Sequence, residues 1–273
     1  MNKAEEKWAE DAEKMKLFLL QEIEETGSEW KVLIERCLGD CQRDKILDVG
    51  CGTGFISLLL AQIGCDVIAI DNNIAMLKEA EKISEELGLS NKITFMLKDA
   101  ESMDFQDNTF DAVVSRHAFW LFNNPKKVYT QWYRILKSGG CMLNLDANWL
   151  FPFWGEEQAK LFQSDENILT KRYGRFQDYY HDTDMMDELK KLPLSYIKRP
   201  EWDLEICRET GFMNIETETL SQEKYWNPFM ALRYRTMPTF IVTLYCLAWV
   251  VAVLISLAYK NVRTMLLLNF VKA

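Results

Sequence analysis

Three glycines at alternate positions follow an acidic residue in the stretch Asp48–Gly54, which reads DVGCGTG. Glycine suits a sharp turn because its backbone adopts conformations that a Cβ would resist, and because a ligand can then approach the main chain closely. A dinucleotide-binding fingerprint, GxGxxG, would need its third glycine at position 55, where this chain has Phe55. The spacing therefore indicates a GxGxG turn, whose backbone N–H groups face a ligand at a helix N-terminus.

The glycine turn needs a strand before it and a helix after it, and the sequence supplies both. Lys45–Val49 is a short apolar run typical of a central parallel strand, and Phe55–Ala61 is apolar apart from Ser57. Further along, strand-like and helix-like segments alternate, which predicts a parallel sheet with right-handed crossovers. Taken alone, the motif could also be an ordinary strand–helix turn without a ligand.

Polar residues come directly after the other predicted strands. Asp71 follows the strand Asp66–Ile70, where its carboxylate can accept both ribose hydroxyls of a nucleoside or, alternatively, cap the next helix. Asp99 and Ala100 follow the strand Ile93–Leu97. The carboxyl ends of the next two strands bring further polar groups to the same edge of the sheet, namely Ser115, Arg116, His117 and Asp146.

Together these features resemble the class I S-adenosylmethionine (SAM)-dependent methyltransferases. Phe110–Ser115 (FDAVVS) resembles the family's fourth-strand motif, and Arg134–Gly140 (RILKSGG) resembles its RxLKPGG turn, with Ser138 in place of proline. That turn is typical of the small-molecule branch, which includes the quinone-biosynthesis methyltransferases. The resemblance covers roughly residues 29–245.

The resemblance implies an α/β fold with a Rossmann-like, doubly wound, seven-stranded and mostly parallel sheet. Its C-terminal antiparallel hairpin is expected from Asn214–Leu220 and Thr239–Leu244. We expect three parts in chain order: an N-terminal helical cap at 1–44, a SAM-binding domain at 45–245 with a helical lid insert at 150–200, and an apolar tail helix at 246–273. A lid would exclude water from the crevice.

The N-terminal cap is expected to contain two helices. The first covers 3–26 and stops near Gly27, and the second covers Glu29–Leu38. Trp8 and Trp30 would either cover one end of the core or help to roof a substrate pocket.

The resemblance implies SAM as the cofactor. Asp71 would contact the ribose, and Asp99 with Ala100 would contact the adenine amino group. On its chemistry alone, Asp99 could equally be a solvated loop residue. The predicted SAM-binding residues are Asp48, Gly50, Cys51, Gly52, Gly54, Asp71, Asn72, Asp99, Ala100, Ser115 and Arg116.

His117 and Asp146 are the candidate catalytic residues, because both stand at strand ends. The sulfonium of SAM is already activated, so the protein mainly aligns a nucleophile in line with the methyl–sulfur bond. A base is needed only when the nucleophile carries a proton to lose, and histidine is the side chain that titrates near neutral pH. A packed, purely structural histidine is an equally good interpretation of His117.

The composition narrows the function classes. A net charge of −9 argues against a nucleic-acid substrate, because phosphate binding needs a basic face. Seven cysteines without framework spacing and two histidines predict reduced thiols in a cytoplasmic protein, with no metal site. The charged N-terminus predicts no signal peptide. The aromatic lid insert favours a small-molecule acceptor.

The tail departs from the family pattern. Residues 236–259 contain no charged residue, and this uncharged stretch is long enough to span a bilayer. However, Thr239–Leu244 is strand-like and Leu247–Tyr259 is helix-like but too short to span alone, so we expect a strand followed by an apolar helix. That helix would pack on the domain, on a second copy in a homo-oligomer, or flat on a membrane through residues 240–259.

These features predict a SAM-dependent methyltransferase that acts on a small molecule by in-line displacement. Within enzymes, the rival is another user of SAM on the same fold, such as an aminopropyl transferase. From a different class, the rival is a SAM-binding non-catalytic or membrane-tethered regulatory protein.

Overall fold

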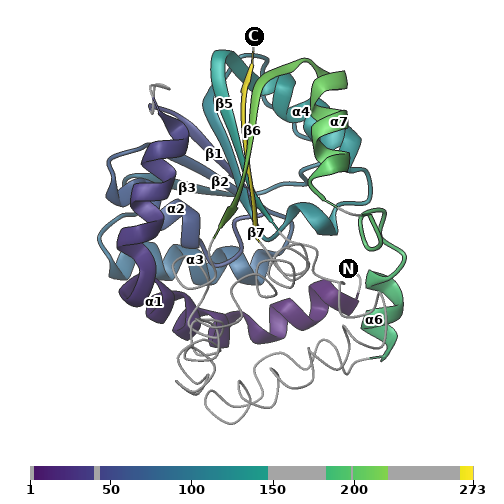
Figure 1. The fold of residues 1–273 in the computed structure, drawn as a ribbon. Helices are drawn as coiled ribbons and strands as arrows, with labels where there is room; N and C mark the ends of the chain where they lie inside the picture. The colour runs from purple at the N-terminus through teal and green to yellow at the C-terminus, as the bar shows by residue number, and fades with distance from the viewer. Residues whose placement is uncertain (1–2, 40–43, 147–182, 198, 221–264, 273) are drawn as a thin grey trace, which may run out of the picture.

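The fold is built on one seven-stranded sheet with the strand order β3-β2-β1-β4-β5-β7-β6 (Figure 1). It is seen in a computed structural model that describes residues 3–39, 44–146, 183–197, 199–220 and 265–272. The parallel strands are β1 (Ile46–Val49), β2 (Val67–Asp71), β3 (Ile93–Leu97), β4 (Phe110–Arg116) and β5 (Leu136–Asp146). Strand β7 (Met265–Lys272) runs antiparallel to β5 and to β6 (Phe212–Leu220).

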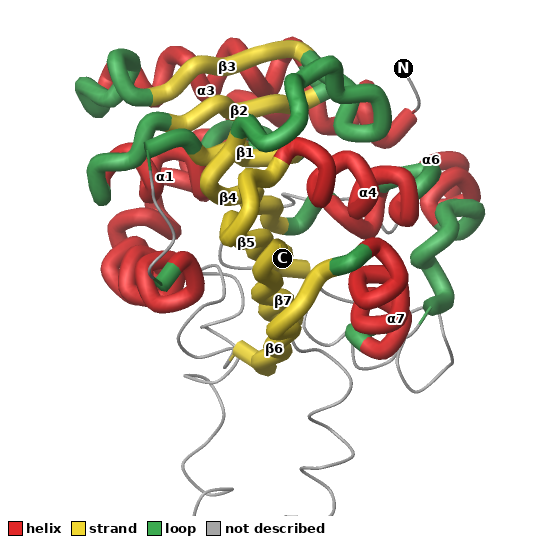
Figure 2. Tube along the Cα trace, turned by 90° about the horizontal axis from the view of Figure 1, so that it is seen from above, coloured by secondary structure: helices red, strands yellow, loops and turns green. Residues whose placement is uncertain are grey.

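Helices cover both faces of this sheet. One apolar core joins the sheet to α1 (Lys3–Leu38), α2 (Phe55–Gln62) and α3 (Ile74–Glu86), and a second joins it to η1 (Phe119–Leu121), α4 (Pro125–Ile135) and α7 (Glu201–Thr210). Figure 2 shows α1 on one side of the sheet and α4 and α7 on the other. The short helix α6 (Thr183–Leu189) packs against residues of α1 and η1.

The sheet places its ligand edge between β1 and β4. Strand β1 pairs with β2 on one side and with β4 on the other, so the strand order reverses at this point. In open α/β sheets, ligands bind in the crevice at the carboxyl ends of the strands where the order reverses. The glycine turn follows β1 and His117 follows β4, so both lie at this switch point. The predicted parallel α/β core is confirmed.

The N-terminal segment differs from the prediction, because α1 is one helix rather than two. Gly27 does not end it. The hydroxyl of Thr26 donates to the Glu22 carbonyl within the helix. Gly27 is buried, and a Cβ added there would lie 3.5 Å from the Leu59 side chain on α2, an ordinary contact distance. Trp30 and the next apolar residues continue the same buried face. Tertiary packing thus outweighs the cost of a mid-helix glycine, which is about 1 kcal/mol.

The predicted turn at Arg134–Gly140 is also different, because β5 begins at Leu136 and contains most of it. Phe110 pairs with Leu136 and Ala112 with Cys141, so the register between β4 and β5 shifts at the intervening residues of β5. A Cβ at Gly140 would lie 2.9 Å from the backbone oxygens of Asp111 and Lys137. A glycine is therefore required at this position by close backbone approach.

The tail prediction needs a correction as well. Residues 265–272 were expected to belong to an apolar helix, whereas they form β7 between β5 and β6. Without β7, the backbone groups on the edge of β5 that faces away from β4 would lack ladder partners, and the apolar run MLLLNFVK suits a central strand. The predicted hairpin strand at 239–244, the rest of the tail and most of the lid insert lie outside the described residues. None of the helices in the described ranges is long and apolar enough to cross a membrane.

Candidate active site

The three glycines of the turn all adopt positive φ, at 69° for Gly50, 54° for Gly52 and 94° for Gly54. Their surroundings differ. A Cβ on Gly50 would lie 2.3 Å from the Cβ of Ala118, and one on Gly54 would lie 3.4 Å from the Cβ of Ala80. A Cβ on Gly52 would meet no described atom within 4 Å. Gly50 is therefore required by packing, whereas Gly54 is required by its backbone conformation, because 3.4 Å is an ordinary contact distance. Gly52 borders open space that a ligand can use.

Asp71 at the end of β2 holds the glycine turn in place. One of its carboxylate oxygens accepts the Gly52 N–H at 2.8 Å and the other accepts the Asn73 N–H at 2.9 Å. The Ile70 carbonyl accepts the N–H groups of both Gly50 and Cys51. The structure thus brings the predicted ribose acid and the turn together, with each carboxylate oxygen keeping further acceptor capacity.

Cys51 lies inside the turn and is buried. Burial, together with the nearby Asp71 and Asp48, raises the pKa of its thiol well above the ordinary value. The thiol stays protonated at neutral pH, so any role of Cys51 in binding rests on its backbone and its shape.

Asp48 is a buried residue of β1, two positions before Gly50. The Ser57 hydroxyl on α2 donates to its carboxylate, which links β1 directly to the helix that follows the turn. Burial raises the pKa of Asp48 to about 7, against the opposing effect of the Ser57 hydrogen bond. The predicted SAM-binding residue Asp48 therefore supports the turn from within.

Stability should depend on pH through Asp48. Its pKa is about 7 in the folded protein and 3.8 ordinarily, so between these values the folded state holds the extra proton. The free energy of unfolding is then expected to fall as the pH rises from about 4 to about 7, and to level off above. Asp48→Asn should remove this contribution. When the free energy of unfolding is measured by urea denaturation at each pH, its slope against pH should therefore differ between the wild type and the variant.

Ser57→Ala is the matched variant. It removes the hydrogen bond that favours the Asp48 carboxylate, so it should extend the falling slope to higher pH. Equal slopes in the wild type and Asp48→Asn would contradict the assignment.

The end of β3 lies beside Asp71. Leu97 pairs in register with Asp71, and the Lys98 N–H donates to the Asp71 carbonyl at 3.0 Å. Asp99 is exposed, and its carboxylate accepts from the Glu101 N–H and the Ser102 hydroxyl. Ala100 is buried. The predicted adenine contacts therefore stand at the same edge of the sheet as the predicted ribose acid.

Ser115 and Arg116 mainly connect elements of the fold. The Ser115 hydroxyl is fully buried and donates to the Val49 carbonyl at 2.9 Å, which joins β4 to β1. The Arg116 guanidinium pairs with Glu22 of α1 at 2.5 Å and lies over the rings of Trp30 and Phe55.

This packing corrects the alternative in which Trp30 roofs a pocket, because Trp30 is completely buried beneath Arg116. Burial raises the pKa of Glu22, and the neighbouring guanidinium opposes that effect. Sequence reasoning missed Glu22, because nothing in a charged amphipathic helix marks one acid as buried.

His117 adopts a positive φ of 60°, which is rare for a residue with a Cβ. Its N–H donates to the Leu145 carbonyl at 2.9 Å, and its own carbonyl accepts the indole N–H of Trp120 at 3.1 Å. Burial and, secondarily, the charge of Arg116 lower the pKa of the imidazole well below its ordinary value. His117 is therefore neutral at physiological pH, the form that can accept a proton.

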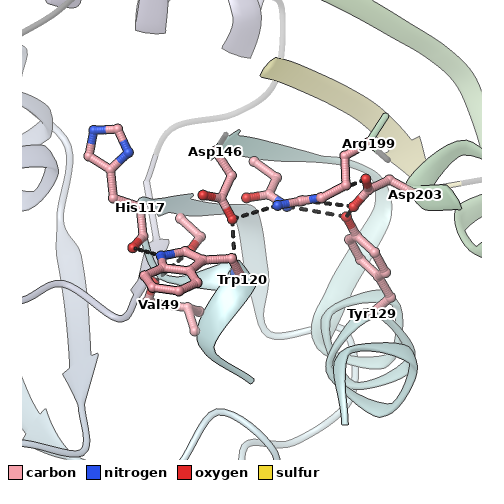
Figure 3. Close-up of polar contacts among 9 residues, drawn as sticks. Val49, His117, Trp120, Tyr129, Asp146, Arg199 and Asp203 are labelled. Atoms are coloured by element: carbon pink, nitrogen blue, oxygen red, sulfur yellow. Dashed lines mark hydrogen bonds and ion pairs between the residues drawn. The ribbon is translucent and has the colours of Figure 1, made fainter. Parts of the chain in front are cut away.

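Asp146 belongs to a buried polar network that sequence reasoning missed. Its Oδ2 accepts two hydrogen bonds, one from the Trp120 backbone N–H at 2.9 Å and one from Arg199 Nη1 at 2.7 Å. Arg199 also binds both oxygens of Asp203, and Tyr129 donates to Asp203 at 2.6 Å. Figure 3 shows this network and the His117 ring pointing away from Asp146. Arg199 precedes α7 and Asp203 lies in its first turn, and their four-residue spacing was the only signal in the sequence.

In the described ranges, no group of three or more His, Cys, Asp or Glu side chains is arranged to hold a metal ion. The site is thus built from a glycine turn, two strand-end acids and a neutral histidine. Such an arrangement can hold a nucleoside-containing cofactor and accept a proton beside it.

Comparison with known proteins supports the same interpretation. A family described as "Methyltransferase domain" matches residues 47–143. A sterol 24-C-methyltransferase from Saccharomyces cerevisiae is 37% identical over 98 residues, which cover 36% of this chain and 26% of that protein. A demethylmenaquinone methyltransferase from Renibacterium salmoninarum is 34% identical over 111 residues, covering 41% of this chain and 44% of that protein. The matched regions thus span less than half of either relative.

Solved structures share the fold. Phosphoethanolamine N-methyltransferase 2 from Haemonchus contortus, in complex with SAM, superposes with a TM-score of 0.59 at 18% identity, covering 89% of this chain and 52% of that one. The [4+2]-cyclase SpnF superposes with a TM-score of 0.55 at 19% identity, covering 89% and 80%. At these identities the likeness concerns the fold, and one fold hosts different reactions. The sequence match and the fold agree: residues 47–143 match a methyltransferase domain, and the fold is one that solved methyltransferase structures share.

Proposed function

We propose that this protein is a SAM-dependent methyltransferase that transfers a methyl group to a small-molecule acceptor by in-line displacement. The observation that carries the proposal is the glycine turn at the switch point of the sheet, where Gly52 borders open space and Asp71 stands beside it. The family match over residues 47–143 supports the same reading.

The residues of the crevice fit SAM by their chemistry. The backbone of Gly52 would border the cofactor, Asp71 would accept the ribose hydroxyls, and Asp99 with Ala100 would contact the adenine amino group. SAM, when bound, supplies a methyl group that its sulfonium already activates. The protein then has to orient the acceptor and exclude water, which residues of the proposed lid insert at 150–200 would do.

His117 is the proposed proton acceptor for an acceptor molecule that loses a proton. Its low pKa keeps the ring neutral, and its place after β4 puts it at the ligand edge. Asp146 is less suited to this role, because its Oδ2 already accepts from Arg199 and from the Trp120 N–H. We therefore assign proton acceptance to His117 alone.

Small molecules of the quinone-like branch are the first acceptors to test. The two relatives named above are a sterol and a demethylmenaquinone methyltransferase, and the net charge of −9 disfavours nucleic acid. The proposed domain limits are 1–44, 45–245 and 246–273. Residues 265–272 of the last part form β7 and therefore belong to the sheet. We also propose that the protein is cytoplasmic and that its tail contacts a membrane, through residues 240–259, or a second copy of the chain.

The test is calorimetric titration with SAM and with its demethylated product, S-adenosylhomocysteine (SAH). We expect saturable binding of both by the wild type and loss of binding in Asp71→Ala, because that variant lacks the ribose acceptor. Asp71 also accepts the Gly52 and Asn73 N–H groups, so Asp71→Asn and a thermal melt of each variant are needed as controls. Absence of binding by the folded wild type would overturn the proposal.

Turnover separates the competing classes. His117→Ala should bind SAH like the wild type and transfer the methyl group about 10²-fold or more slowly, the usual contribution of a general base. Binding without turnover across sterol, quinone and amine acceptors would favour a non-catalytic SAM-binding protein instead. An unchanged rate in His117→Ala would remove this residue from the mechanism.

A further inference from the structure

Arg199 is a guanidinium enclosed in the core by two carboxylates. Its Nε and Nη2 bind the two oxygens of Asp203 at 2.7 Å each, and its Nη1 binds Asp146 at 2.7 Å. The side chains of all three residues are at most 1% exposed. Burying such a group is expensive, and apolar residues of similar size often serve stability as well. Stability alone is therefore a weak reason for this arrangement.

Asp146 connects this guanidinium to the ligand edge of the sheet. The same Oδ2 that binds Arg199 also accepts the N–H of Trp120, at the start of η1 (Figure 3). The Trp120 indole in turn donates to the His117 carbonyl. One carboxylate oxygen thus joins Arg199, at the end of the proposed lid insert, to the segment His117–Leu121.

The segment His117–Leu121 bears directly on the glycine turn. Ala118 packs closely on Gly50, because a Cβ added at Gly50 would lie 2.3 Å from the Cβ of Ala118. The His117 N–H is held by the Leu145 carbonyl, one residue before Asp146. The position of this segment therefore affects the cofactor turn through Gly50 and the proposed proton acceptor through His117.

We propose that Arg199 is a positioning residue: through Asp146 it fixes the segment His117–Leu121 against Gly50, and so sets cofactor affinity. The second half of this proposal rests on the proposed function. Asp146 acts here as the link in the chain of contacts, which replaces its predicted role as a base. Asp203 holds the opposite side of the guanidinium on α7. Among the described residues it makes no hydrogen bond to the segment, and it is linked to the segment only indirectly, through Tyr129, whose ring packs on Phe119.

The test compares Asp146→Ala with Asp203→Ala. Both truncations remove one buried carboxylate from Arg199, so both leave the same charge balance, and only the first removes the acceptor of the Trp120 N–H. We expect hydrogen–deuterium exchange in residues 117–121 to accelerate in Asp146→Ala, and the Kd for SAH to rise roughly tenfold to hundredfold, the size of one hydrogen bond to a charged group. In Asp203→Ala, the exchange rate in residues 117–121 and the Kd for SAH should both stay within about threefold of the wild-type values.

Asp146→Asn provides a conservative rescue, because its amide oxygen can still accept the Trp120 N–H. It should recover part of the slow exchange and of the affinity. Where truncation to alanine prevents folding, Asp146→Leu and Asp203→Leu replace the two alanine variants, because leucine also removes the acceptor while filling the space. Equal effects in the Asp146 and Asp203 variants would overturn the proposal and leave the proposed function standing. If the wild type does not bind SAH, the proposed function fails, and the exchange data alone decide whether Arg199 positions the segment.

Discussion

Gly50→Ala is expected to abolish measurable SAH binding and to destabilise the protein by about 3 kcal/mol or more. Two costs combine. An alanine at the φ of 69° is in the left-handed region, which costs about 1–2 kcal/mol, and its Cβ would lie 2.3 Å from that of Ala118, an overpacking that typically costs about 1–3 kcal/mol. Chemical denaturation and calorimetric titration measure the two effects.

Gly52→Ala is the matched control within the same turn. Its φ of 54° carries a similar backbone cost, while its Cβ would meet no described atom within 4 Å. We expect this variant to keep its fold and to lose SAH affinity through the ligand side alone. Adding Ala118→Gly to Gly50→Ala should restore most of the stability lost to overpacking. A Gly50→Ala protein as stable as the wild type would contradict the packing described above.

Arg116→Met is expected to destabilise the protein by about 3–5 kcal/mol, the usual cost of leaving one partner of a buried ion pair alone. The side chains of Arg116 and Glu22 are 9% and 8% exposed, so solvent cannot replace the lost contact. The Glu22→Leu/Arg116→Met double variant should recover much of the loss, because methionine packs well against the Trp30 and Phe55 rings. Urea denaturation of the wild type, Glu22→Leu, Arg116→Met and the double variant gives the coupling energy between the two side chains.

Arg36→Met on the same helix is the comparison. Arg36 pairs with Glu218 at the surface, where the side chains are 55% and 43% exposed, and exposed pairs contribute about 0–1 kcal/mol. Hydrogen exchange should also show faster opening of α1 in Arg116→Met and no change in Arg36→Met. Similar losses in the two single variants would show that the buried pair does not hold α1 to the sheet.

Short-range patterns account for the part of the site that could be predicted. The strand before Gly50, the alternate glycines and the apolar helix after them are adjacent in the chain, so their geometry follows from local backbone preferences. Asp71 and Asp99 could be placed for the same reason, because parallel strands bring their carboxyl ends to one edge. The parallel α/β core followed from the alternation of strand-like and helix-like segments.

Long-range partners account for what could not be predicted. Glu22 and Arg116 are 94 positions apart, and Asp146 and Arg199 are 53 positions apart, so no periodicity links them. The same limit applies to β7, whose apolar residues 265–272 fit a buried helix or a central strand equally well until β5 and β6 are in place. The sequence by itself determined the glycine turn and its flanking elements, and it led to the proposed class of ligand. Only the tertiary structure decided which charges are buried together, because a buried charge is tolerated only where the folded chain brings a partner to it.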